Sequence, residues 1–177
     1  MYNQKSRHFL LALALSFFGL NCIKANADEL EAWWLRVQFP VGDQQYLGLN
    51  AAEIDPQWAR YSLIDFDSLP TEAKPDIASM KSEHLAFKKE GDFNKNGLAD
   101  QAFVGNFETK DDKTGRFFLI AEKQKADIWK VIFLHKEIGD AGFSVIAEKD
   151  KALYWAPCIQ CSEFRKLVKQ GNNLILQ

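Results

Sequence analysis

The chain lacks a second long apolar run, and it lacks any excess of basic residues. After residue 27 no apolar stretch approaches the length that spans a bilayer, so we expect no membrane span in the mature chain. The 22 basic residues are balanced by 24 acidic ones. Because no basic stripe is present, we do not expect nucleic acid as a partner.

The sequence also lacks the short motifs that identify many enzymes. It contains no G-x-S-x-G, no H-E-x-x-H and no glycine-rich phosphate loop. Acidic residues are plentiful, but their spacing does not favour a carboxylate pair for glycoside hydrolysis. These absences favour a non-catalytic role, and they leave open a hydrolase whose acidic residues meet only in the fold.

Residues 1–27 are typical of a secretory signal peptide. Lys5 and Arg7 precede the apolar run FLLALALSFFGL, which is too short to span a bilayer comfortably. Ala25 and Ala27 then stand at the small-residue positions before a cleavage point. We therefore expect export, with cleavage near Ala27.

The expected mature chain is one domain, residues 28–177, located in the periplasm or secreted. Two alternatives remain open at this stage. One is an uncleaved membrane anchor. The other is a lipoprotein attached at Cys22, although Asn21 stands where a lipobox needs a small residue.

Two cysteines follow the expected cleavage point, Cys158 and Cys161, and we predict a disulfide between them. An even pair in an exported chain usually forms one, here closing a very short loop. Two other readings of Cys-x-x-Cys are open. A redox-active pair belongs at a helix N-terminus. A zinc site needs two further ligands, for which only His84 and His135 remain.

Residues 83–177 alternate short runs rich in Phe, Val, Ile and Trp with turn residues. The pattern predicts roughly seven or eight short strands. Their close spacing leaves no room for crossover helices, so the sheet must be mostly antiparallel. We predict an antiparallel β-meander, forming a curled sheet, a small sandwich or a barrel.

Residues 28–80 are interpreted as a short mixed helical and loop part that precedes this sheet, which makes the fold class α+β. An apolar helical face is predicted before Pro40. The stretch 68–82, with two prolines and few large apolar residues, is interpreted as a loop or a pair of short turns. The helical face consists of Leu30, Trp33, Trp34 and Val37.

Residues 91–105, GDFNKNGLADQAFVG, place oxygen-bearing side chains at alternate positions around one glycine. Calcium takes six to eight oxygen ligands, which a tight loop of this kind can supply. Gly97 stands where the loop turns sharply and where a left-handed conformation costs little only for glycine. The predicted metal ligands are the side chains of Asp92, Asn94, Asn96 and Asp100 and the backbone oxygen of Leu98.

The start of this loop matches an EF-hand, but Phe103 stands where an EF-hand has its bidentate glutamate, and both flanks are strand-like. Residues 91–105 instead resemble the calcium loop of FG-GAP or VCBS-type repeats, which occur in integrin-like β-propellers. The resemblance implies a β-hairpin whose loop holds the ion through the ligands just named. One copy builds no propeller, so it implies neither that fold nor its binding role.

Only two of the predicted ligands are carboxylates. The expected calcium affinity is therefore weak, about 10⁻⁴–10⁻³ M, and the expected role of the ion is structural. The alternative is an ordinary turn whose Asn and Asp side chains hydrogen-bond to their own backbone.

The remaining candidate residues are predicted to be structural. His84 and His135 are placed at strand ends without a catalytic role. Trp129 and Trp155 alternate with other apolar residues on strands and are expected in the core.

The sequence thus predicts an exported, non-catalytic binding or accessory protein of the periplasm or cell envelope, with a calcium-stabilised β-hairpin. Its partner would be an unknown protein or envelope component. Two alternatives are a small periplasmic hydrolase and a thiol–disulfide accessory protein that uses Cys158 and Cys161.

Overall fold

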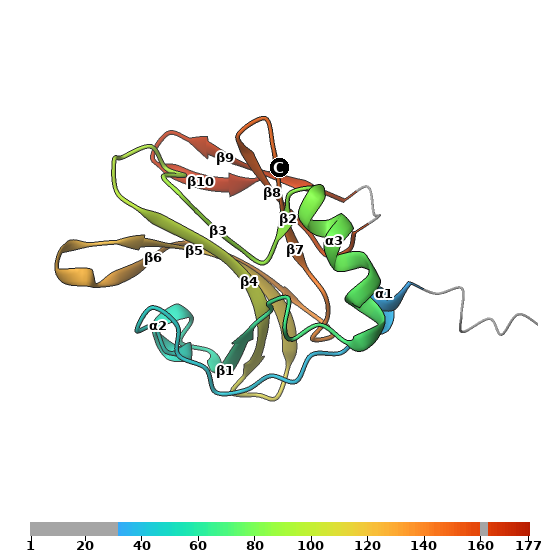
Figure 1. The fold of residues 1–177 in the computed structure, drawn as a ribbon. Coiled ribbons are helices and arrows are strands. Elements are labelled where there is room, and N and C mark those ends of the chain that lie inside the picture. The colour runs from blue at the N-terminus through green and yellow to red at the C-terminus, as the bar shows by residue number, and fades with distance from the viewer. Residues whose placement is uncertain (1–31, 160–162) are drawn as a thin grey trace, which may run out of the picture. The chain divides into compact units, whose positions relative to one another are not determined.

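The computed structural model describes residues 32–159 and 163–177. They form two five-stranded sheets, paired antiparallel throughout, with a few short helices (Figure 1). The expected antiparallel, β-rich fold is confirmed at this level. The predicted signal peptide, Cys22 and Cys161 lie outside the described residues.

The first sheet has the strand order β1–β4–β5–β6, with β3 also paired to β4. Successive strands β4, β5 and β6 are therefore neighbours, as in a meander. Its strands are β1 (Trp58–Leu63), β3 (Lys88–Gly91), β4 (Asp100–Thr109), β5 (Thr114–Lys123) and β6 (Trp129–Ile138).

The second sheet has the strand order β10–β9–β8–β7–β2. Four consecutive strands again lie side by side, and the short β2 completes the sheet by pairing with β7. Its strands are β2 (Leu85–Ala86), β7 (Val145–Lys149), β8 (Ala152–Ala156), β9 (Arg165–Gln170) and β10 (Asn173–Leu176).

The helices are short, and one of them corrects the sequence interpretation. Residues 68–82 are not a loop, because most of them form a helical turn followed by α3. Pro75 lies in the first turn of α3, where its missing N–H costs no hydrogen bond. The helical elements are α1 (Trp33–Arg36), α2 (Ala51–Ile54), η2 (Thr71–Ala73), α3 (Lys74–Ser82) and η3 (Lys125–Asp127).

The part of the chain before residue 80 also contributes a strand, which the sequence interpretation missed. Asn50 and Glu53 form a reciprocal capping box at the start of α2, and the helix ends at Asp55. The chain then extends into β1, which pairs with β4 from Trp58 to Leu63.

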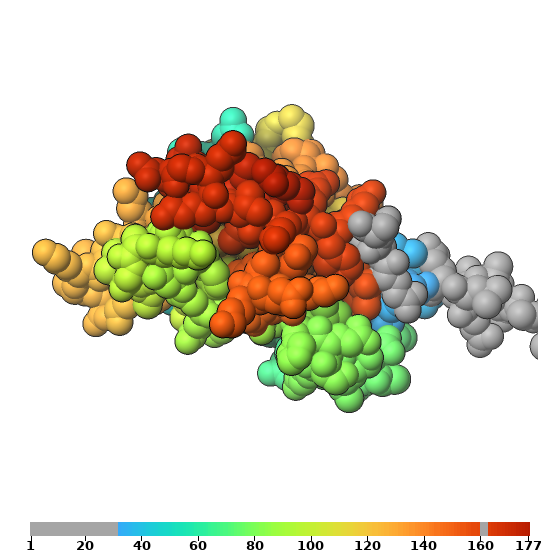
Figure 2. All heavy atoms as spheres, turned by 90° about the horizontal axis from the view of Figure 1, so that it is seen from above, coloured from blue at the N-terminus to red at the C-terminus, as the bar shows by residue number. Residues whose placement is uncertain are grey.

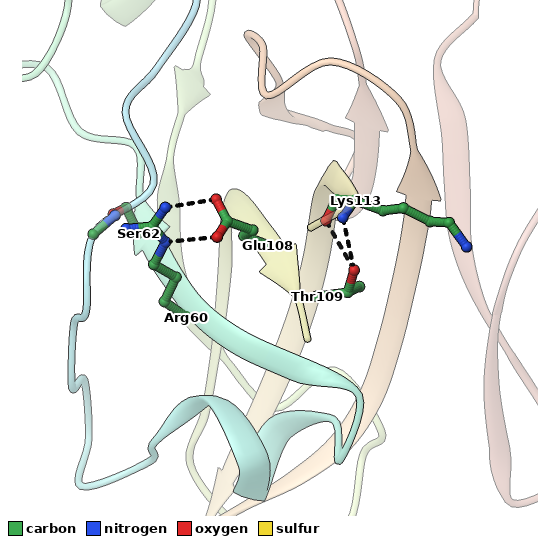
Figure 3. Close-up of polar contacts among 6 residues, drawn as sticks. Arg60, Ser62, Glu108, Thr109 and Lys113 are labelled. Carbon is green, nitrogen blue, oxygen red and sulfur yellow. Dashed lines mark hydrogen bonds and ion pairs between the residues drawn. The ribbon is translucent and has the colours of Figure 1, made fainter. Parts of the chain in front are cut away.

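The outer end of the β1–β4 pair is held by polar contacts, one exposed and one part-buried, drawn in Figure 3. Arg60 donates two hydrogen bonds to Glu108 across the strands, at 3.1 and 2.7 Å. The Thr109 hydroxyl accepts the Lys113 backbone N–H at 3.0 Å in the turn that follows. A solvent-exposed pair such as Arg60 and Glu108 fixes register more than it stabilises the fold.

Apolar clusters cover both faces of the first sheet. One cluster lies between the first sheet, the second sheet and α3, and it contains the fully buried Trp155. The other lies under α2 and β1, and Trp129 packs at its margin. The core position expected for Trp155 is confirmed, whereas Trp129 is only half-buried.

Two glycine–phenylalanine pairs cross between β4 and β5. Gly105 lies opposite Phe117, and Phe107 lies opposite Gly115. Each ring occupies the space that a Cβ on the facing glycine would need. The repeated G-x-F spacing on the two strands therefore fixes how they pair.

Candidate functional site

The predicted ion loop lies between β3 and β4 at the end of a two-stranded pairing. Gly91 faces Asp100 in the register of these strands, so residues 92–99 form the connection. The β-hairpin expected at this position is present in the structure.

Side-chain oxygens of the loop accept backbone N–H groups from residues further along it. The Asp92 carboxylate accepts from Asn96 at 3.0 Å and from Gly97 at 2.9 Å. Asn94 Oδ1 accepts from Asn96, and Asn96 Oδ1 accepts from Leu98. Gly97 has φ of +85°, which confirms the left-handed glycine. Each oxygen keeps a second lone pair for another partner.

Asp100 is the buried acid of the loop, with only 1% of the residue exposed. Its Oδ2 accepts the Phe93 N–H at 2.7 Å, but Oδ1 has no hydrogen-bond partner in the described part of the chain. Burial raises the pKa of Asp100, and the Phe93 N–H, followed by the nearby Asn94 N–H, opposes that rise. The negative charges of Glu122 and Asp92 raise this pKa further. A cation beside Oδ1 would relieve both the missing bond and the repulsion.

Glu122 on β5 is the site residue that the sequence interpretation missed. It faces Asp100 in the β4–β5 register and is 7% exposed. Its Oε2 accepts Asn94 Nδ2 at 2.6 Å and also accepts Asn96 Nδ2, while Oε1 accepts Gln124 Nε2 at 2.5 Å. Burial alone would raise the pKa of Glu122, but these three amide hydrogen bonds hold it below its usual value. Only the strand register could have pointed to this residue.

A lysine from the second sheet also reaches the loop. Lys169 on β9 donates from its ammonium group to the backbone oxygen of Asn94. Figure 2 shows the yellow-green atoms of this hairpin beside the red atoms of β9 and β10. The loop is therefore anchored to both sheets.

The donor set suits a hard cation only if amide and carbonyl oxygens contribute. Across residues 32–159 and 163–177 no three His, Cys, Asp or Glu side chains are close enough to form a metal group by themselves. Calcium sites regularly combine carboxylates with asparagine and backbone oxygens. The buried Asp100 oxygen and the all-oxygen donor set of the loop are consistent with such an ion.

Cys158 is buried and lies two residues after the end of β8. The redox alternative needs a helix N-terminus, and the described residues around Cys158 are not helical. Since Cys161 lies outside the described residues, the disulfide stays a prediction.

The placement of His135 at a strand end is wrong, because it lies inside β6. β6 runs longer than the sequence pattern suggested, since it pairs with β5 over the whole length of both strands. The His135 ring packs on Trp155 with centroids 5.0 Å apart. Its Nε2 lies 3.0 Å from an Arg165 nitrogen and 3.5 Å from a Glu137 oxygen. His84 does precede a strand, β2, and has φ of +60°.

His135 is expected to make the fold sensitive to mild acid. Burial lowers its pKa and the charge of Arg165 acts in the same direction, whereas Glu137 opposes them. The unfolded chain, with a histidine pKa near 6.5, therefore takes up the proton first as the pH falls. This contribution to stability is present above about pH 6.5 and is lost as the pH falls through the native pKa.

The expected result is a steeper loss of unfolding free energy between about pH 7 and pH 5 in the wild type than in His135→Gln. Urea denaturation at several pH values measures it. Parallel pH profiles for the two chains would contradict the assignment.

Two hollows of the described surface contain none of the buried carboxylates. One, of about 600 Å³, lies beside β2, β7 and β8 and is lined by His84 and the exposed acids Glu83 and Glu148. The other, of about 360 Å³, is mainly apolar and includes Phe66 and Phe87. The buried acids, which line neither hollow, are Asp55, Asp100 and Glu122.

None of the described helices has the length and apolarity that crossing a membrane requires. Comparisons with protein-family models, curated proteins and solved structures found no match to this chain.

Proposed function

We propose that this protein binds calcium in the β3–β4 loop and that the ion holds the hairpin in place. The observation that carries the proposal is the Asp100 carboxylate, which is buried with one oxygen lacking a partner among the described residues. A buried carboxylate oxygen without a hydrogen bond destabilises the native state, so it is not expected in a loop that serves only as a turn. The remaining ligands are Asp92, Asn94, Asn96 and the Leu98 backbone oxygen.

The site is weak, because few of these ligands are charged and Lys169 brings a competing positive charge to Asn94. An affinity of about 10⁻⁴–10⁻³ M fits an extracellular or periplasmic calcium concentration rather than a cytosolic signal. The ion therefore has a structural role.

We further propose that the chain is an exported, non-catalytic binding or accessory protein of the periplasm or cell envelope. Export is supported by the signal-peptide features of residues 1–27. A binding role is supported by the mainly apolar hollow of about 360 Å³. The other hollow, where His84 lies beside Glu83 and Glu148, keeps the hydrolase as the alternative. The two sheets, sharing one apolar cluster, suit a small sandwich. The partner is a protein or an envelope component.

Millimolar calcium is expected to raise the thermal midpoint of the wild-type mature protein relative to chelator. Ligand at ten times its dissociation constant stabilises the native state by about 1.4 kcal/mol. For a chain of this length that corresponds to a shift of about 3–5 °C. The measurement is a thermal melt followed by circular dichroism.

Asp92→Ala is expected to abolish this calcium-dependent shift, since it removes a ligand and two acceptors of loop N–H groups. Glu90→Gln on the neighbouring strand is the control, because it removes one exposed negative charge without touching the loop. If calcium leaves the midpoint of the wild type and of Glu90→Gln unchanged, the site does not exist.

A further inference from the structure

We infer that Glu122 is a positioning residue of the ion loop, which orients the amides of Asn94 and Asn96 so that their oxygens face the ion. The inference rests on the calcium proposal and adds a residue that is remote from the loop in sequence. It assigns a role to the one buried carboxylate beside the loop that is not a predicted ligand.

The orientation follows from the chemistry of an amide. A side-chain amide carries an acceptor oxygen and a donor nitrogen, and only the oxygen has lone pairs that a cation can use. The Nδ2 atoms of Asn94 and Asn96 both donate to Glu122 Oε2. Their Oδ1 atoms consequently point the other way, into the loop, where they accept N–H groups of Asn96 and Leu98. Without Glu122, either amide could rotate and present its nitrogen to the ion.

Glu122 acts on the asparagines rather than on the ion itself. Both of its oxygens already accept amide hydrogens, since Oε1 is bound by Gln124 and Oε2 by the two asparagines. No ion pair to Glu122 occurs among the residues that the structure describes. Its buried charge is therefore satisfied by these amides, and turning it toward the ion would leave their donors without an acceptor.

This arrangement also explains why the loop has asparagine where an aspartate would bring more charge to the ion. An aspartate at position 94 or 96 has no hydrogen to donate to Glu122. It would place a second carboxylate within hydrogen-bond distance of a buried one. Asn94 and Asn96 are thus matched to the acid on β5.

The first test is a calcium titration of the folded mature protein. Its readout is the backbone NMR signal of Gly97, whose N–H donates to Asp92. Glu122→Ala is expected to weaken calcium binding about 10–100-fold, the usual effect of losing a group that orients a metal ligand. Glu122→Gln keeps one acceptor oxygen and is expected to lose less. The control Glu90→Gln removes one negative charge from β3, on the other side of β4 from Glu122, and should bind as the wild type does.

The second test exchanges the hydrogen-bond donor and acceptor between positions 94 and 122. It distinguishes a role of Glu122 in orienting the ligands from a purely structural role. Asn94→Asp alone is expected to weaken calcium binding although it adds a negative charge. Combined with Glu122→Gln, the new aspartate can accept from the glutamine amide, and binding should be tighter than in Asn94→Asp alone. The rescue stays partial, because Asn96 Nδ2 shares the same Oε2 acceptor in the wild type and loses it in this pair. A purely structural Glu122 would lower the melting midpoint in chelator without this reciprocal rescue.

The outcomes separate the two proposals. If the wild type does not bind calcium, the proposed function itself is wrong. If the wild type binds and Glu122→Gln binds equally well, or if Asn94→Asp strengthens binding in both backgrounds, Glu122 does not position the ligands. Should Glu122→Ala fail to fold in chelator, Glu122→Gln and the exchanged pair decide the question.

Discussion

Replacing Gly105 with alanine is expected to lower the free energy of unfolding by about 3 kcal/mol or more. A Cβ at this position would lie 2.2 Å from the backbone oxygen of Ser62 and 2.7 Å from the ring of Phe117. Neither neighbour can move aside easily, because Ser62 is paired in β1 and Phe117 is fully buried. Urea denaturation of the two chains measures the difference.

Gly142→Ala is the matched control for this substitution. A Cβ on Gly142 would have no neighbour closer than 3.7 Å, which is ordinary van der Waals contact. Alanine there is expected to leave the free energy of unfolding unchanged or to raise it by about 0.4–1 kcal/mol, because alanine lowers the conformational entropy of the unfolded chain. Equal effects at both positions would mean that the close approach of β1 to β4 is not as described.

Adding Phe117→Leu to Gly105→Ala tests which contact dominates. The smaller side chain would relieve the contact with the ring, but the backbone oxygen of Ser62 would remain 2.2 Å from the new Cβ. The double variant is therefore expected to be no more stable than Gly105→Ala. Full recovery would show that the ring alone excludes a side chain at position 105.

Trp58→Ala is expected to destabilise the native state by about 3–5 kcal/mol. Trp58 is 1% exposed and stacks on Phe107 with ring centroids 4.5 Å apart and an angle of 5° between the planes. The ring of Phe117 also packs against Trp58, with ring centroids 5.0 Å apart and an angle of 46° between the planes. Removing the indole leaves a cavity under α2 that the surrounding strands cannot fill.

Trp58→Phe separates the loss of the ring stack from the loss of the indole N–H. The indole nitrogen has no hydrogen-bond partner among residues 32–159 and 163–177, so its removal costs no bond. Trp58→Phe should therefore cost much less than Trp58→Ala in the same urea titration. A similar loss in both variants would indicate that the N–H is satisfied in solution.

The hydrogen-bonded loop between β3 and β4 was predictable because its pattern is local. Asp92, Asn94, Asn96 and Gly97 lie within one short stretch, and their side chains bond to backbone groups a few residues away. Such contacts depend on residue order and on the conformational freedom of glycine, both of which the sequence states directly. The surrounding strands were predictable for the same reason, since alternation and turn residues are local signals.

The errors lie where local signals compete. The two prolines of residues 68–82 favour a loop or short turns, yet Pro75 is accommodated in the first turn of α3. The strand from Trp58 to Leu63 was missed because its apolar residues gain their burial from β4 and α2 rather than from a clear alternation of their own.

The sequence by itself determined the β-rich antiparallel class, the hairpin and the loop residues that bear oxygen. Only the tertiary structure decided that the strands divide into two sheets and that Glu122 lies beside the loop. It also decided that Asp100 is buried with one oxygen that has no partner among the described residues. The reason is physical. Glu122 reaches Asn94 through the β4–β5 register, and a shift of one residue would turn its side chain to the opposite face of the sheet.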